Sequence, residues 1–274
     1  MINIENLWVK YKNIDVIRDI SLDIDRGLVV VAGKTGSGKT TLARTIAGII
    51  PHIIHAEVRG IIDVLGVSPI TQGISALAGK LVYVPQNPEM YVTSLYVDDE
   101  IVSIACNIGE ERIEITERLK RIVARLGIHN LLDKNVLALS SGQLQLVSIA
   151  TALVSGAKIL LLDEPLARLD YVNSMKISKI LREIANDGRL VIVFEHHLDH
   201  LIYLSDRVIL IDEGRIVADA PPREAIYSLI EIDIPEISEA FSMLYRNGCV
   251  DRIPISVDEA LKVFMDAITK RHMV

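Results

Sequence analysis

The sequence predicts an α/β fold in which a mainly parallel sheet is covered by helices on both faces. Three short apolar runs, at residues 28–31, 159–162 and 190–194, have the composition of buried strands. Helical patterns separate these runs along the chain, and strands that alternate with helices favour a parallel sheet. A glycine-rich segment follows the first run directly, at residues 33–40.

Shorter strands with antiparallel character are expected beside this core. Residues 2–4 and 21–25 alternate polar and apolar side chains, as a strand with one buried face does. The hairpin-like residues 208–217 add further antiparallel character, whereas residues 81–84 are expected only to form another strand, of no stated direction, which Pro85 stops. The sequence therefore predicts an antiparallel β subdomain next to the parallel core.

The segment from about residue 87 to residue 153 is predicted to form a mostly helical subdomain. Within it, one helix face is indicated by the spacing of Ile115, Leu119, Ile122 and Leu126. Pro221 and Pro222 mark a boundary. We therefore expect one domain over residues 1–220 and a small, mostly helical extension over residues 221–274.

The glycine-rich segment reads Gly33-Lys34-Thr35-Gly36-Ser37-Gly38-Lys39-Thr40 and matches the phosphate-loop pattern G-x-x-x-x-G-K-[ST]. Glycines let the backbone curl around phosphate oxygens, and the helix start expected near Gly38 directs N–H groups at the anion. Lys39 adds a positive charge, and the Thr40 hydroxyl can bind Mg²⁺. A glycine-rich turn without a ligand is the alternative, but the match after a strand favours a nucleoside triphosphate. The predicted contacts are Gly33, Lys34, Thr35, Gly36, Ser37, Gly38, Lys39, Thr40 and Thr41.

An acidic pair, Asp163 and Glu164, follows the second apolar run. A carboxylate at the C-terminal end of a strand beside a phosphate loop can hold Mg²⁺ through its water shell. The neighbouring Glu164 can act as the general base that activates water. Alternatively, Asp163-Glu164-Pro165 only ends a strand; next to a phosphate loop, we favour catalysis.

A helix start is indicated at Leu139-Ser140-Ser141-Gly142-Gln143. Ser140 and Gln143 have the spacing of a capping box, which needs no further function. The same start also presents free N–H groups and a serine hydroxyl to an anion. Both interpretations stay open at this point.

Composition limits the possible partners and location. The formal charge of −7 argues against broad nucleic-acid binding, which relies on a basic surface. Half of the residues are hydrophobic, yet no apolar run approaches the roughly 18 residues of a spanning helix. The N-terminal residues lack a secretion-signal pattern, and Cys106 and Cys249 lack metal-ligand spacing. We expect a cytosolic protein with apolar surface that partners cover.

The order of these motifs resembles that of the ATP-binding cassette (ABC) ATPases. The resemblance covers residues 1–220 and adds Gln86, in Pro85-Gln86-Asn87-Pro88, and His196 after the third apolar run. It implies a P-loop (RecA-like) core with ATP and Mg²⁺ as ligands. It also implies a head-to-tail dimer that sandwiches ATP between one chain's phosphate loop and the other's helix start at Ser140.

The roles of this family carry over to matching positions. Tyr11 would stack on adenine, Gln86 would sense Mg²⁺ and couple to the membrane partner, and Asp163 would organise the metal with Thr40. Glu164 would be the catalytic base, and His196 would contact the γ-phosphate and position the water. Lys39 would take part in catalysis as the positive charge on the phosphates. Ser140 and Gly142 would contact the γ-phosphate held by the opposite subunit, and Asp170 would end the loop that crosses the dimer.

The histidine segment has a second interpretation. His196 and His200 lie four residues apart, so a helix could present both to one metal ion. No H-E-x-x-H pattern or cysteine partner accompanies them, and the position after a strand favours the phosphate-contacting role of His196.

Several positions depart from the family pattern. Ser141 replaces the first glycine of the usual signature, Ala167 and Arg168 replace a serine and an alanine, and Glu195 stands where threonine is common. We expect a complete phosphate-loop side and an altered signature side. That arrangement suits an asymmetric pair with a related second subunit, although a homodimer remains open.

Residues 86–89 and 97–101 are similar to segments of the energy-coupling factor transporters, the cobalt/nickel and vitamin importers, and so are the tail motifs at residues 235–237 and 255–260. Tyr91 departs from this group, because a later glutamine is usual there. The similarity implies a peripheral subunit at the cytoplasmic face of the cell membrane, with a membrane coupling protein and a substrate-binding membrane subunit as partners. The alternatives are a phosphate-loop kinase or GTPase, and a non-transport ABC ATPase that acts as a mechanical or regulatory clamp.

Overall fold

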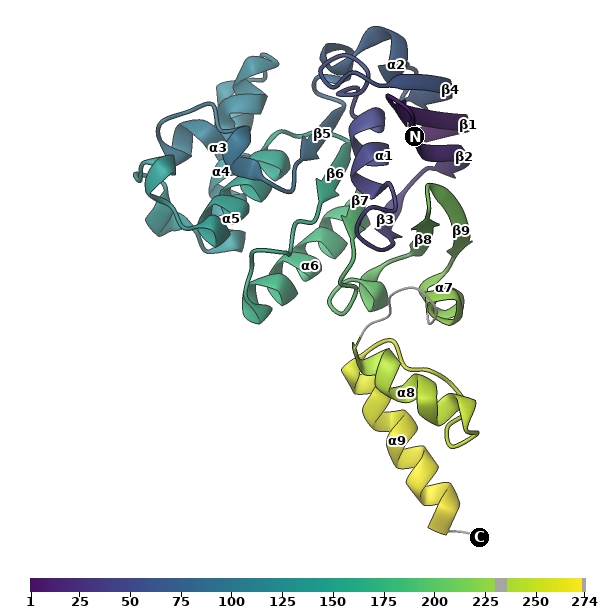
Figure 1. Ribbon diagram of the computed structural model, residues 1–274. Helices are drawn as coiled ribbons and strands as arrows, with labels where there is room; N and C mark the ends of the chain where they lie inside the picture. The colour runs from purple at the N-terminus through teal and green to yellow at the C-terminus, as the bar shows by residue number, and fades with distance from the viewer. Residues whose placement is uncertain (230–235, 273–274) are drawn as a thin grey trace.

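The computed structural model describes residues 1–229 and 236–272, arranged around two sheets (Figure 1). The strands are β1 (Ile2–Tyr11), β2 (Ile14–Ile24), β3 (Gly27–Ala32), β4 (Glu57–Val64), β5 (Leu81–Val84), β6 (Ile159–Asp163), β7 (Leu190–Glu195), β8 (Arg207–Asp212) and β9 (Arg215–Ala220). The α-helices are α1 (Lys39–Ile46), α2 (Pro69–Gln72), α3 (Val97–Asn107), α4 (Arg112–Leu126), α5 (Ser141–Val154), α6 (Tyr171–Asn186), α7 (Pro222–Leu229), α8 (Glu236–Arg246) and α9 (Val257–His272).

The central sheet has six strands in the order β5-β6-β7-β3-β8-β9. Neighbouring strands run parallel except for the β8–β9 hairpin, which is antiparallel. Because side chains alternate across a strand, β3 sends Val30 to one apolar cluster and Val31 to another. The sheet is therefore buried on both faces, which explains why its parallel strands are continuous apolar runs.

Different elements cover the two faces. Residues of α3, α4, α5, α6 and α7 complete the first cluster. The second cluster is completed by α1 and by the three-stranded antiparallel sheet β2-β1-β4. The arrangement confirms the predicted α/β class with an antiparallel β subdomain.

The strand β4 was not predicted from the sequence. Gly60 interrupts its pattern with a φ of 101°, and a Cβ there would lie 2.5 Å from the Asn6 carbonyl oxygen. The strand pairs with β1, which is about fifty residues away in the chain. Because the two strands are far apart in the chain, no local sequence pattern predicts that they pair.

The helices α3, α4 and α5 form a lobe on the left of Figure 1, within the segment expected to be helical. At the other end, α7 adds Ala225, Ile226 and Leu229 to the first cluster, whereas Phe241, Ala260 and Val263 form a small cluster of α8 and α9. The proposed division at residues 220 and 221 stays a prediction. Within the described residues, no helix combines the length and apolar character needed to cross a membrane.

Candidate nucleotide-binding and hydrolysis site

The phosphate loop (residues 33–40) lies at the C-terminal end of β3, where α1 begins. Gly33 has a φ of 147°, and a Cβ there would lie 2.1 Å from the Ile211 carbonyl oxygen. No larger residue fits this position, because the loop passes directly against β8. Gly38, with a φ of 109°, then caps α1. The predicted strand–turn–helix is confirmed.

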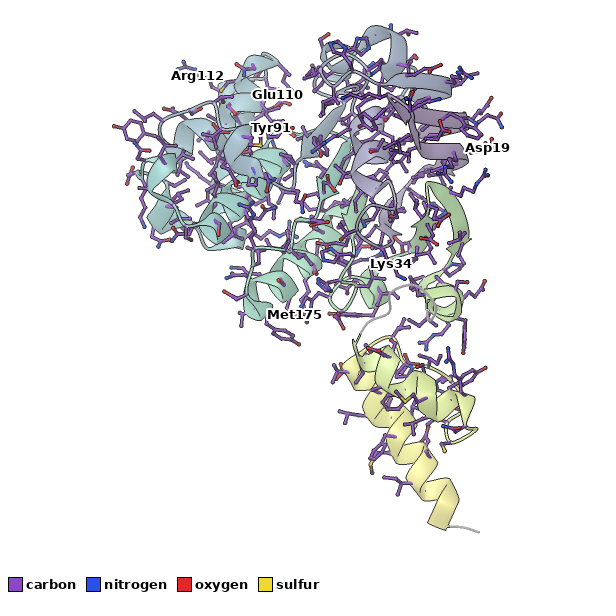
Figure 2. All side chains as sticks on the ribbon, in the orientation of Figure 1. Asp19, Lys34, Tyr91, Glu110, Arg112 and Met175 are labelled. Atoms are coloured by element: carbon purple, nitrogen blue, oxygen red, sulfur yellow. The ribbon has the colours of Figure 1, made fainter. Side chains whose placement is uncertain are left out.

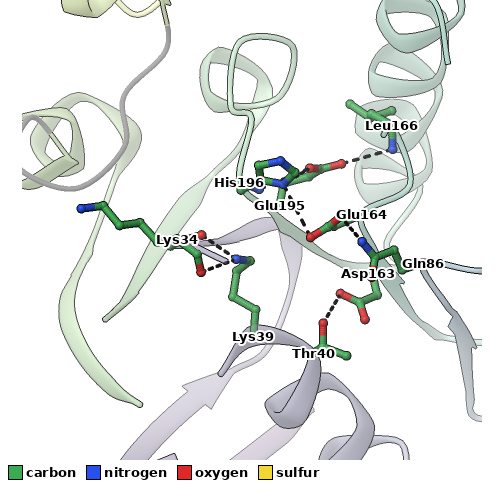
Figure 3. Close-up of polar contacts among 10 residues, drawn as sticks. Lys34, Lys39, Thr40, Gln86, Asp163, Glu164, Leu166, Glu195 and His196 are labelled. Atoms are coloured by element: carbon green, nitrogen blue, oxygen red, sulfur yellow. Dashed lines mark hydrogen bonds and ion pairs between the residues drawn. The ribbon is translucent and has the colours of Figure 1, made fainter. Parts of the chain in front are cut away.

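Lys39 brings a positive charge into the loop. Its side chain is buried, and its Nζ donates to the Gly33 carbonyl at 2.5 Å and to the Lys34 carbonyl at 3.1 Å (Figure 3). The Ser37 hydroxyl is also buried and has no hydrogen-bond partner among the described residues. A buried ammonium and an unsatisfied hydroxyl within a curled backbone suit an oxyanion such as a triphosphate. Lys34, Thr35 and Gly36 are exposed at the loop surface, where Figure 2 labels Lys34.

Asp163 lies at the end of β6, two strands from β3, and is fully buried. Its Oδ1 accepts from the Thr40 hydroxyl at 3.1 Å, and its Oδ2 accepts from the Tyr83 hydroxyl at 2.9 Å. Burial raises the pKa of Asp163, and the two hydrogen bonds oppose that rise. Asp163 and Thr40 thus come together from different strands, as expected for residues that share a metal ion.

Glu164 follows in a left-handed backbone conformation, with a φ of 48°. Non-glycine residues rarely adopt this conformation, and such strain concentrates at functional sites. One carboxylate oxygen accepts from Gln86 Nε2 at 2.5 Å, and the other lies 3.5 Å from His196 Nδ1 (Figure 3). The structure therefore brings the predicted base, the predicted metal-sensing glutamine and the predicted phosphate-contacting histidine together.

A further carboxyl group, that of Glu195, lies at the end of β7 beside this cluster and is 1% exposed. Burial raises its pKa from 4.5 to about 8, and the nearby Glu164 acts in the same direction. The unfolded chain therefore loses this proton near pH 4.5, while the folded protein keeps it up to about pH 8. The folded state consequently loses stability as the pH rises through this window, by at most about 1.4 kcal/mol per unit.

Replacing Glu195 by glutamine, which does not titrate, tests this dependence. Relative to the wild type, Glu195→Gln should become progressively more stable from about pH 5 to about pH 8, as measured by urea unfolding. Glu259→Gln is the control, because Glu259 is also largely buried. Burial raises the pKa of Glu259, but hydrogen bonds donated by the Arg223 side chain and the Ile255 N–H outweigh burial and hold this pKa below 4.5. The difference in free energy of unfolding between Glu259→Gln and the wild type should stay constant from about pH 5 to about pH 8. A difference for Glu195→Gln that is equally independent of pH would contradict the raised pKa of Glu195.

The remaining predicted residues lie outside this cluster. Tyr11 ends β1, pairs with Ile14 and packs against the second apolar cluster. Ser140 caps α5 in the capping box expected from the sequence, with the Gln143 N–H donating to its hydroxyl at 3.3 Å. Asp170 caps α6 and accepts from the Asn173 N–H at 2.8 Å. Their proposed contacts with a nucleotide stay predictions.

Gly142 lies where α5 meets the crossing loop, residues 164–170. A Cβ at Gly142 would lie 3.0 Å from the Arg168 carbonyl oxygen. The Arg168 guanidinium in turn donates to Glu89 Oε2 at 2.9 Å and contacts Asn87. The crossing loop therefore touches both the signature helix α5 and the segment that follows Gln86.

Two site residues were not assigned a role from the sequence. Tyr83 was expected only as part of a strand, and Glu195 was noted only as a departure from a family pattern. The available signal was a polar side chain within or at the end of an otherwise apolar strand. Their contacts with Asp163 and His196 depend on the strand order, which the sequence pattern does not reveal.

The residues present fit Mg²⁺. Asp163 offers carboxylate oxygens and Thr40 offers a hydroxyl oxygen, and hard oxygen ligands from one or two side chains plus phosphates are typical of magnesium sites. The alternative metal site at His196 and His200 finds less support. His200 packs edge-on against Tyr171, and the described residues contain no cluster of three or more histidine, cysteine or acidic side chains that could hold a metal.

Comparisons with known proteins identify the family of this chain. The family model described as ABC transporter matches residues 17–167. An ABC transporter ATP-binding protein of Treponema denticola is 34% identical over 222 residues, which cover 80% of this chain and 45% of the relative. One from Pyrococcus abyssi is 29% identical over 270 residues, which cover 95% of this chain and 96% of the relative. The chain thus spans less than half of the first relative's length and nearly all of the second's.

Solved structures give the same result. The structure of cbiO1 from Clostridium perfringens, part of the ABC transporter complex cbiONQ, aligns with a TM-score of 0.71 at 29% identity. The alignment covers 90% of this chain and 96% of that chain. The family match over residues 17–167 covers more than half of the chain and includes the phosphate loop and the acidic pair. The chain therefore belongs to the ABC transporter family, as one of its ATP-binding ATPase domains.

Proposed function

We propose that the chain is the ATP-binding subunit of an ABC-type importer of the energy-coupling factor class. It would act at the cytoplasmic face of the cell membrane and power uptake through a membrane coupling protein and its substrate-binding membrane subunit. The observation that carries the hydrolytic role is the convergence of Lys39, Asp163, Glu164 and His196 at one edge of the sheet. The importer class is supported by the likeness to cbiO1, part of the complex cbiONQ.

The chemistry follows from the donors and acceptors at this edge. The loop N–H groups and Lys39 would bind the phosphates, which fixes the terminal phosphorus near Glu164. Glu164 would take a proton from the attacking water, and His196, 3.5 Å away, would hold that water and the γ-phosphate. Tyr11 would stack on adenine. Lys34, Thr35, Gly36, Ser37, Gly38 and Thr41 would complete the phosphate contacts.

Asp163, Thr40 and Gln86 would hold Mg²⁺. The ion neutralises phosphate charge and orients the γ-phosphate when bound. Tyr83 fixes the direction of the Asp163 carboxylate through its hydroxyl, at 2.9 Å. Gln86 donates a hydrogen bond to the Glu164 carboxylate, so a movement of Gln86 would change the position of the base.

The second half of each ATP site would come from another subunit. Ser140 and Gly142 lie at the partly exposed N-terminus of α5, in the helical lobe, whereas β3 and α1 lie at the centre of Figure 1. A head-to-tail dimer, which would bring this helix start to the other chain's phosphate loop, uses its free N–H groups to bind the anion. Asp170 would end the loop that crosses this interface.

Coupling to the membrane partner would use the segment after Gln86. Met90, Tyr91, Leu95 and Tyr96 are exposed there, and Tyr91 lies beside the helical lobe (Figure 2). A cavity of about 80 Å³ lies beside Tyr91 and is lined by Tyr91, Glu100 and Ser148 among others. Arg168 links this segment to the crossing loop, which gives the partner a direct connection to the hydrolysis site.

The sandwich predicts a separation of ATP binding from dimer formation. With ATP and Mg²⁺, Glu164→Gln should form a dimer in light scattering, because it binds ATP but turns it over slowly. Adding Gly142→Asp should abolish that dimer, since a carboxylate would face the triphosphate, while ATP affinity measured by calorimetry persists. A dimer that survives Gly142→Asp would contradict the proposed interface. If Glu164→Gln dimerises only with a related ATPase subunit present, the working pair is mixed.

Purification from solubilised membranes tests the transport role. The tagged chain should bring down a multi-span membrane protein, and its ATPase activity should respond to that protein. Association with ribosomes or DNA instead would replace transport by the clamp function.

A further inference from the structure

We propose that Glu195 is a positioning residue for ATP hydrolysis, because it ties the loop that carries Glu164 to the backbone of His196. The inference rests on the proposed function, and it assigns a role to a residue that does not touch the nucleotide. It predicts that Glu195 affects turnover without affecting ATP binding.

The Glu195 carboxyl bridges two segments that come from different strands. Its Oε1 accepts from the Leu166 N–H at 3.1 Å, in the crossing loop after β6 (Figure 3). Its Oε2 accepts from the His196 N–H at 3.3 Å, after β7, and lies 3.8 Å from His196 Nδ1. One side chain therefore sets the spacing between the loop that contains Glu164 and the loop that contains His196.

The crossing loop needs such an anchor because it starts under strain. Glu164 has a φ of 48°, and its N–H donates to the Phe194 carbonyl at 2.9 Å. Phe194 and Glu195 are consecutive, so the end of β7 holds the loop twice: by backbone at Glu164 and by side chain at Leu166. Losing the hydrogen bond between Leu166 and the Glu195 side chain would let the Glu164 backbone relax toward an ordinary conformation, since strained residues persist only where their surroundings fix them.

Burial of the Glu195 carboxyl also affects its charge, through its pKa. The titratable groups that face the Glu195 carboxyl are Glu164, His196 and Lys39. On the side of α6, the cavity that Glu195 lines also contains His197 and Asp199, together with His200 and Asp258. Burial raises the pKa of Glu195 to about 8, so near neutral pH its carboxyl does not place a second negative charge beside Glu164.

If Glu195 had only a structural role, any group that fills its place at the end of β7 would suffice. This structural role predicts that loss of Glu195 lowers thermal stability and leaves the rate of ATP hydrolysis by the folded protein unchanged. The positioning role predicts a loss of turnover at temperatures where every variant is folded. The two roles are therefore separable by kinetics.

The test measures kcat and the ATP dissociation constant for the full chain with ATP and Mg²⁺, well below each variant's Tm. Glu195→Ala should lower kcat by about 10- to 100-fold, the usual cost of misplacing a catalytic group, and leave the dissociation constant within about twofold. Glu195→Gln should lie between it and the wild type, because the amide oxygen can still accept from Leu166. Its amide nitrogen cannot accept from His196.

Two comparisons make the result specific. Glu259→Gln, which changes a largely buried carboxylate of the C-terminal helices, should leave kcat unchanged. In a His196→Ala background, Glu195→Ala should cost much less than in the wild type, because residues that act together are not additive. An unchanged kcat for Glu195→Ala, a parallel loss of ATP affinity, or full additivity with His196→Ala would overturn the proposal. A wild-type chain that lacks ATPase activity even with its partners would overturn the proposed function as well; normal wild-type activity with an unaffected Glu195→Ala would overturn only this inference.

Discussion

Glu164→Gln is expected to lower the rate of ATP hydrolysis by about 10²- to 10⁴-fold, the usual contribution of a positioned general base. A glutamine has nearly the same shape but cannot take a proton from water at neutral pH. The loss should fall on kcat, because, among the described residues, the Glu164 carboxylate contacts Gln86 and His196 rather than the phosphate loop. Steady-state ATPase assays, combined with calorimetry of ATP binding, measure the two effects separately.

The control for this variant is Glu183→Gln. Glu183 lies on α6, is more than half exposed and pairs with Arg125, away from the site. Its replacement should leave hydrolysis unchanged. Normal turnover by Glu164→Gln would remove Glu164 from the role of base, and a loss of ATP binding would instead show that it holds the phosphate loop together.

Lys39→Ala should abolish tight ATP binding. The ammonium is 5% exposed and held by two loop carbonyls, so its charge lies within the curl that would receive the phosphates. Charge-assisted hydrogen bonds contribute about 1.5–3 kcal/mol each, and the loss of two or more weakens binding by about 100-fold or more. Calorimetric titration with ATP and Mg²⁺ measures the change.

Lys39 also bonds to its own loop, so folding must be checked together with affinity. Circular dichroism and Tm should show that Lys39→Ala keeps the fold, since the sheet and both apolar clusters do not depend on it. Lys179→Ala, which removes an exposed lysine from α6, should bind ATP as the wild type does. Unchanged affinity in Lys39→Ala would contradict the phosphate-loop assignment.

The local parts of the fold and site were predictable from the sequence. β3, β6 and β7 are continuous apolar runs because both of their faces are buried. The phosphate loop and the capping box of α5 were also predictable, because each is formed by residues close together in the chain. The family resemblance went further and gave Gln86, Glu164 and His196 roles at the ATP site, and the structure brings these three side chains together.

What required the tertiary structure was every relation that depends on strand order. β4 was missed because its pattern is broken at Gly60 and its partner β1 is distant in sequence. The hydrogen bond from Tyr83 to Asp163 exists because β5 lies beside β6, and the bridge from Glu195 to Leu166 exists because β7 lies beside β6.

The sequence by itself thus determined where the phosphate-loop motif lies and which carboxylates follow buried strands, since each of these features is formed by a short segment of the chain. The tertiary structure decided which of them meet, how far apart they lie and that Glu164 is held in a left-handed conformation. The physical reason is that parallel strands align their C-terminal ends at one edge only after non-local pairing, and burial then shifts the pKa of Asp163 and Glu195.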